Sequence, residues 1–197
     1  ATRTVVKDAT NPIVAITSAP AINNANKAAY VVSGTCNENT RIVSIVVGGI
    51  TATPTCTSSA WTATLNVSAL SDSPSVVVTA DLSDAAGNSA TQATTNIVKD
   101  TSNPSVAISS SPLVNNANKT AYTVSGTCSE TGRNVTVNVG STNTSTLCSL
   151  LTWTATLNVS GNPDSATLLV TADHTDAAGN TAVQAGVTVL KDTTNPT

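Results

Sequence analysis

The chain has 197 residues, of which 10% are charged and 2% are aromatic, and its formal net charge is −3. It therefore lacks the concentrated basic surface that nucleic-acid binding requires, and no apolar run approaches the roughly 18 residues that cross a bilayer. We expect no nucleic-acid partner and no insertion of this segment into a membrane.

The sequence repeats itself with a period of 92 residues, which separates Asp8 from Asp100. The segment 8–12 returns as 100–104 and again as 192–196, and the segment 84–88 returns as 176–180. A long period without net insertion predicts a tandem array of folded units, each large enough for one modest core.

Four segments follow from this period. Residues 9–100 and 101–192 are predicted to be two complete repeats. Residues 1–8 match the end of the first repeat and are expected to be the last strand of a preceding one, while residues 193–197 are expected to begin a following one. We therefore expect an excerpt from a longer array.

Within each repeat, apolar and polar residues alternate with a period of two, which is typical of half-buried antiparallel strands. Clusters of Gly, Asn and Ser separate these runs and indicate turns. In the second repeat the alternating runs are, in chain order, 106–108, 122–128, 135–139, 153–159, 168–172 and 183–189.

About seven short strands per repeat, with no helical period, predict an all-β protein. We expect two tandem immunoglobulin-like β-sandwich domains, end to end. In that topology the loops after the second, fourth and sixth strands share the end at which the chain enters the domain.

The four cysteines form one pair per repeat, with 20 residues between partners: Cys36 with Cys56, and Cys128 with Cys148. Such pairs in a small unit predict disulfides and an oxidising, extracellular compartment. A zinc site is disfavoured because no Cys-x-x-Cys spacing occurs. Free buried thiols remain the other interpretation.

Carboxylates recur at four positions in each repeat. In the second repeat they are Asp100, Glu130, Asp173 and Asp176, and the predicted topology brings the linker and two loops that carry them to one end. At least three acids should therefore converge at the junction between repeats. The first repeat has the same set at Asp8, Glu38, Asp81 and Asp84.

Clustered carboxylates repel one another unless a cation offsets their charge. Lys99 and Arg133 are close in sequence, but Ca²⁺, which binds six to eight oxygens, fits this donor set better. Strand alternation directs Asp81 and Asp173 outward, so they are weaker candidates. The predicted calcium ligands are Asp8, Glu38, Asp84, Asp100, Glu130 and Asp176. In the alternative interpretation these aspartates only make turn hydrogen bonds.

No catalytic constellation recurs in the repeats. The single histidine, His174, replaces Leu82 of the first repeat, so we expect it on the surface. Neither a Ser-His-Asp nor a Cys-His set can repeat without histidine, and we expect no enzymatic activity.

Four motifs occur in the same order in both repeats, and in the second repeat they span residues 100–104, 125–130, 153–156 and 176–180. They resemble the bacterial immunoglobulin-like (Big-type) tandem repeats of large extracellular surface proteins and adhesins. In calcium-binding members of that family the matching acids are ligands, which the resemblance transfers to Asp100, Glu130 and Asp176 and to Asp8, Glu38 and Asp84. The chain departs from the family pattern in its cysteine pair and in the Asn before Pro104.

The resemblance implies a structural, non-enzymatic module in a rod-like stalk or fibre at a bacterial cell surface, with neighbouring repeats as partners and calcium stiffening the junctions. A first alternative is an adhesive module that binds a host or prey surface through its loops, with 49–55 and 141–147 as the candidate segment. A second is a self-assembling filament, in which the outward residues Ile42 and Val46 would contact other copies.

Overall fold

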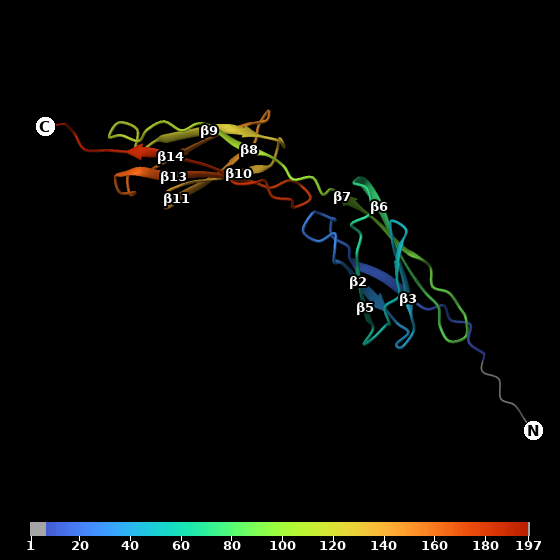
Figure 1. Cartoon of the computed structure of the whole chain (residues 1–197). Helices are drawn as coiled ribbons and strands as arrows, with labels where there is room; N and C mark the ends of the chain where they lie inside the picture. The colour runs from blue at the N-terminus through green and yellow to red at the C-terminus, as the bar shows by residue number, and fades with distance from the viewer. Residues whose placement is uncertain (1–6, 197) are drawn as a thin grey trace, which may run out of the picture. The chain divides into compact units, whose positions relative to one another are not determined.

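The computed structural model describes residues 7–196 (Figure 1). The chain divides into two compact units, Ala1–Thr101 (unit 1) and Ser102–Thr197 (unit 2). Residues 7–196 contain strands and no helix, and hence no helix able to cross a membrane. Most of the predicted strand 1–8 lies outside the described residues, and Lys7 and Asp8 are not in a strand.

Unit 1 builds two antiparallel sheets from its described strands, with the orders β1-β2-β5 and β4-β3-β6-β7. The predicted all-β sandwich is thereby confirmed. Its strands are β1 (Val14–Ser18), β2 (Tyr30–Cys36), β3 (Val43–Val47), β4 (Ile50–Ala52), β5 (Ala60–Leu65), β6 (Ser73–Leu82) and β7 (Ala93–Lys99).

Unit 2 repeats this topology, with the orders β12-β9-β8 and β11-β10-β13-β14. Its strands are β8 (Val106–Ser110), β9 (Tyr122–Cys128), β10 (Asn134–Val139), β11 (Thr142–Leu147), β12 (Thr152–Leu157), β13 (Ser165–His174) and β14 (Ala185–Lys191). On β2 and on β9, every second residue is buried, so the period read from the sequence marks the faces that form each core.

The fourth strand of each unit pairs with the third, so it forms a hairpin at the edge of the four-stranded sheet. Segments 49–55 and 141–147, predicted to present a loop face, instead contain all of β4 and all of β11. Gly48 and Gly140 have φ of 56°, a conformation that suits a two-residue hairpin turn and sends the chain directly back along its neighbour.

Both predicted disulfides are confirmed, and the described cysteines include no free thiol. Cys36 bonds to Cys56 and Cys128 to Cys148, with Cα atoms 6.0 and 6.1 Å apart. Each bond joins the end of the second strand to the residues just before the fifth, the two strands that pair in the three-stranded sheet.

The tryptophan of each core lies against a glycine on the neighbouring strand. Trp61 Nε1 donates to the Thr35 carbonyl at 3.2 Å. A Cβ on Gly34 would come within 2.5 Å of the Trp61 ring and 1.8 Å of the Ala15 carbonyl oxygen. Gly126 and Trp153 repeat this packing in unit 2. The glycine of the Ser-Gly-Thr motif therefore makes room for the largest side chain of a core that is poor in aromatics.

The expectation that His174 lies on the surface is wrong, because its side chain is 2% exposed. It ends β13 in the inward register of Val170 and Ala172, which Leu82 occupies in unit 1. Its Nδ1 lies 3.0 Å from the Asn134 carbonyl oxygen, and Nε2 is buried with no hydrogen-bond partner. Register, rather than side-chain polarity, decides the burial of this residue.

Candidate metal centre

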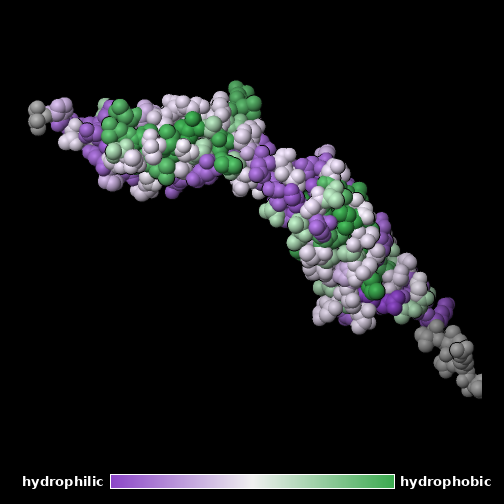
Figure 2. Space-filling model, viewed as in Figure 1, coloured by the Kyte–Doolittle hydropathy of each residue, from purple (hydrophilic) through white to green (hydrophobic). Residues whose placement is uncertain are grey.

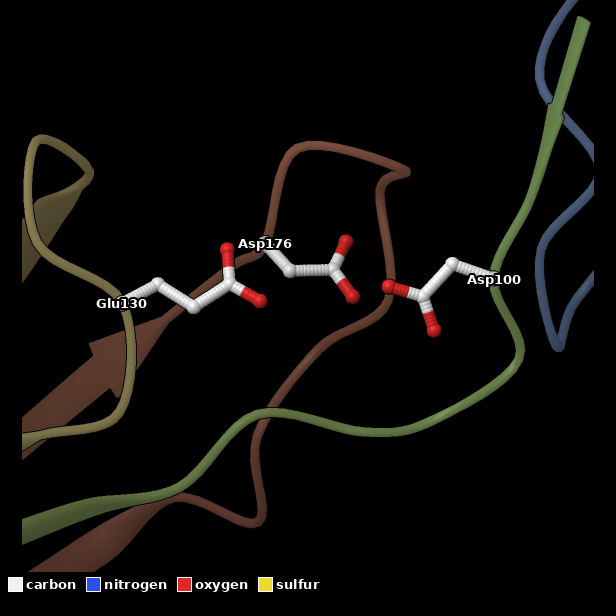
Figure 3. A group of neighbouring side chains, drawn as sticks. All are labelled: Asp100, Glu130 and Asp176. Carbon is white, nitrogen blue, oxygen red and sulfur yellow. The ribbon is translucent and has the colours of Figure 1, made fainter. Parts of the chain in front are cut away.

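Asp100, Glu130 and Asp176 come together in the structure, with one carboxylate oxygen of each within 4.8 Å of the others. Figure 3 shows the three carboxylates directed toward one another, with Asp176 between the other two. Asp100 follows β7, Glu130 lies between β9 and β10, and Asp176 lies between β13 and β14. Asp176 is 1% exposed, whereas the other two are half-buried.

A tight turn holds Asp176 in place. The Asn180 N–H donates to Oδ1 and the Asn180 Nδ2 to Oδ2, both at 2.7 Å, while the Asp176 N–H donates to the Asn180 carbonyl at 3.0 Å. Gly179, with φ of 89°, supplies the left-handed residue within this turn. Asp176 therefore makes the turn hydrogen bonds of the alternative interpretation as well as belonging to the acidic group.

The same turn occurs in unit 1. The Asn88 N–H and Nδ2 donate to the two oxygens of Asp84 at 2.8 and 2.6 Å. The side-chain hydrogen bond from Asn88 is the main cause that holds the pKa of Asp84 below its usual value. The turn of unit 1 thus stabilises the Asp84 carboxylate in its charged form, which is the form that binds a cation.

The donor set fits a single hard cation. Ca²⁺ binds oxygens at about 2.3–2.6 Å, so two ligands on opposite sides of the ion are roughly 4.6–5.2 Å apart. The separation of up to 4.8 Å among the three acids is compatible with this limit. A carboxylate oxygen that accepts one hydrogen bond keeps a lone pair for a metal, and carbonyls or water would complete the coordination.

The bases named as possible counter-charges have other partners. Lys99 pairs with Asp72 at 3.1 Å. The Arg133 guanidinium donates to backbone carbonyls, with Nη2 2.9 Å from the Asp176 carbonyl oxygen and Nε 3.5 Å from that of Thr175. These contacts direct both cations to other acceptors than the side-chain oxygens of the acidic group.

The remaining predicted ligands are placed differently. Among residues 7–196, Asp8, Glu38 and Asp84 do not form a group as close as that of Asp100, Glu130 and Asp176. Asp8 is exposed. Asp81 and Asp173 lie on β6 and β13 outside the acidic group. The nearest carboxylate oxygens of Asp81 and Asp173 accept from the side-chain amides of Gln92 and Gln184 at 2.9 Å.

An ion pair that was not predicted from the sequence lies where the chain leaves each unit, at the end of the last strand. Asp72, Lys99 and Thr101 form what we call the exit clamp of unit 1. Lys99 is 3% exposed, and its Nζ lies 3.1 Å from Asp72 Oδ1, while the Thr101 N–H donates to Asp72 Oδ2 at 3.1 Å. The clamp fixes the last residues of the unit, and Ile22 pairs with the same segment through a parallel bridge to Lys99.

Unit 2 has the same exit clamp, formed by Asp164, Lys191 and Thr193. Lys191 Nζ lies 2.9 Å from Asp164 Oδ1, and the Thr193 N–H donates to Asp164 Oδ2 at 3.1 Å. The hydrogen bond from Lys191, followed by that from the Thr193 backbone, lowers the pKa of Asp164 to about 2. The recurrence of this Asp and Lys at the 92-residue period was the available sequence signal.

Comparison of the sequence with protein-family models and with curated protein sequences finds no match. The structure is similar to the fibronectin(III)-like modules of CbhA from Clostridium thermocellum, with a TM-score of 0.61 and 13% identity over 91% of this chain and 95% of that chain. It is also similar to a Ca²⁺-stabilised adhesin with which an Antarctic bacterium binds ice, with a TM-score of 0.51 and 24% identity over 95% of this chain.

These likenesses establish the fold of the two units as immunoglobulin- or fibronectin-like sandwiches. The chain spans half the length of the solved adhesin chain that it matches.

The exit clamp predicts acid-sensitive stability. In the unfolded chain Asp164 should titrate near its usual pKa of about 3.9, and in the folded chain its pKa is about 2. A depressed folded pKa means that the stabilisation is complete above about pH 4 and is lost as the pH falls toward 2. Asp164→Asn should therefore lower the melting temperature at neutral pH, and its difference from the parent should shrink in acid.

Melting curves from pH 7 to 2 would measure this difference, with Asp173→Asn as the control. Asp173 lies on β13, which begins directly after Asp164, and its carboxylate accepts hydrogen bonds from the exposed Gln184 side chain. A constant gap between Asp164→Asn and the parent across the whole pH range would contradict the role of the clamp.

Proposed function

We propose that this chain is a structural, non-enzymatic repeat module of a rod-like stalk or fibre in a bacterial cell-surface, adhesin-type protein. The observation that carries the proposal is that the features shared by the two units either build the interior of a unit or lie at its ends. Each unit has the same sandwich, inter-strand disulfide, Asp-Ala-Ala-Gly-Asn turn and exit clamp. Such repetition conserves a building block and its ends, with neighbouring repeats as its partners.

The setting of the similar proteins supports the same proposal. A bacterial adhesin stabilised by Ca²⁺ is among the structures that share this fold. The two disulfides suit an oxidising environment outside the cytoplasm. We therefore place the chain in the extracellular part of a surface protein.

We further propose that Asp100, Glu130 and Asp176 bind Ca²⁺. A bound ion would neutralise the repulsion among the three carboxylates. Because Asp100 follows β7 and the other two residues lie in loops of unit 2, coordination would tie the linker to those loops and limit its motion. Asp8, Glu38 and Asp84 are the corresponding candidates for the preceding junction.

The adhesive alternative has less support than the spacer. The segments expected to form a divergent binding loop contain strands β4 and β11, whose backbones pair with β3 and β10. We therefore expect the chain itself to bind neither cells nor glycans. A cell-binding and glycan-array assay on the chain measures this, and saturable binding would contradict the spacer function.

Calcium should raise the thermal stability of the chain. At a free concentration about a hundredfold above the dissociation constant, binding to the folded state alone adds about 2.7 kcal/mol. We expect calcium to raise the melting temperature over that in EDTA, and Asp100→Asn or Glu130→Gln to reduce this rise. Magnesium should be a weaker substitute because it demands a stricter octahedral geometry.

Asp81→Asn is the control variant, since Asp81 lies on β6 and contacts Gln92, and it should keep the full response to calcium. Equal melting temperatures in calcium and in EDTA would overturn the metal site. That result would leave the spacer function to be judged by the binding assay.

A further inference from the structure

Unit 1 carries an open groove of about 430 Å³ beside β3 and β6, which we call the unit 1 groove. Its apolar wall consists of Val46, Leu70, Val76 and Val77, and Val77 is 47% exposed. Gly49 forms part of the rim, where an added Cβ would meet no atom within 4 Å. The groove is therefore apolar and accessible, with room for more than one aliphatic side chain.

Unit 2 has polar residues at the same place. Asn162 replaces Leu70, and its Nδ2 donates to the Val139 carbonyl at 2.8 Å while its Oδ1 accepts from Ser141 Oγ at 2.7 Å. A second amide, Asn138, replaces the valine on the third strand and donates to a threonine hydroxyl at 3.2 Å. Two of the four apolar wall residues of the unit 1 groove are therefore amides in unit 2, whereas Val76 and Val77 correspond to Leu168 and Leu169.

Unit 2 instead exposes two leucines in the turn Ser149–Thr152, which we call the leucine turn. Leu150 is 85% exposed and Leu151 is 53% exposed. Their φ angles are 51° and 62°, a left-handed conformation that is unfavourable for residues with a bulky side chain. Figure 2 shows apolar (green) residues gathered in patches on the largely polar surface of the chain.

The turn itself does not require leucine. Its counterpart in unit 1 contains Ser58 and Ser59, with φ angles of 52° and 61°. Reciprocal backbone hydrogen bonds of 2.8–3.1 Å close both turns. Since serine supports the same backbone, the two leucines add exposed apolar surface without a local structural gain, which points to a partner.

Charge also favours a meeting of these two surfaces. The stretch 42–71, which supplies the β3 side of the groove and Leu70, contains no charged residue, and neither does the stretch 142–163 around the leucine turn. Two copies that each carry a net charge of −3 repel one another in general. A contact made by these two stretches alone pairs no charged residue with another.

We propose that the leucine turn of one copy binds in the unit 1 groove of a second copy of this chain. The leucines occur only in the turn of unit 2, and the counterpart of the groove in unit 2 carries two amides, so the interface is heterologous and can continue from copy to copy. A contact of this size is small by the standards of stable complexes and should be weak for a single pair. Several such contacts between longer arrays would add through avidity.

The test uses sedimentation equilibrium of the chain up to millimolar concentration. The turn variant, Leu150→Ser with Leu151→Ser, and the groove variant, Val46→Asn with Leu70→Asn, each import the residues of the other unit. The parent should associate as its concentration rises, and the association of each variant should be weaker by a factor of about ten or more. A mixture of the two variants should regain association into pairs, because each supplies the half that the other lacks.

A parent that remains monomeric throughout overturns the proposal, and so do variants that associate as strongly as the parent or a mixture that does not associate. Binding of the parent to neutral lipid vesicles without self-association would assign the leucines to a membrane surface and overturn it as well. Near-ultraviolet circular dichroism checks folding; should the groove variant unfold, the parent series and the turn variant decide. The outcome is independent of the calcium response, so each proposal can fail alone.

Discussion

The disulfide between the second and fifth strands organises one end of each unit, which in unit 2 carries the leucine turn and the loop of Glu130. In unit 2, the Cys128 N–H donates to the Leu151 carbonyl at 3.0 Å, and the Cys148 N–H donates to the Arg133 carbonyl at 2.8 Å. One cysteine therefore holds the leucine turn, and the other holds the loop that carries Glu130. The same bonds recur around Cys36 and Cys56. Closing a loop of this length contributes about 3 kcal/mol in the chain-entropy model.

The opposite end of each unit is held by charge instead of a covalent bond. Lys99 is buried at the end of β7 and pairs with Asp72, which also caps the Thr101 N–H. Removing Asp72 would leave the buried Lys99 charge without this partner, so Asp and Lys are required together. A unit that is fixed covalently at one end and by the clamp at the other has defined attachment points for its neighbours, as a spacer requires.

Local alternation predicted the sandwich, because a period of two identifies the buried face of β9 or β12 without tertiary information. The presence of one cysteine pair in each small repeat predicted the disulfides, also without tertiary information. The exit clamp was missed because 27 residues separate Asp72 from Lys99 and only the folded sheet brings them together. The burial of His174 was missed because its replacement of Leu82 was taken to mean a surface position, although Leu82 marks the same register as buried. The leucine turn was missed because its left-handed residues are not the Gly or Asn that usually signal such a turn.

Mechanical unfolding of the chain, pulled from its two ends, tests most directly whether each unit is an independent, disulfide-bonded spacer. The account predicts two unfolding events, one for each unit, and a longer extension of each event after reduction of the disulfide. With a sequence separation of 20 between the bonded cysteines, whose Cα atoms are already 6.0 and 6.1 Å apart, reduction should release about 60–66 Å more chain per unit. A single event for the whole chain, or equal extensions in oxidised and reduced protein, would contradict the account.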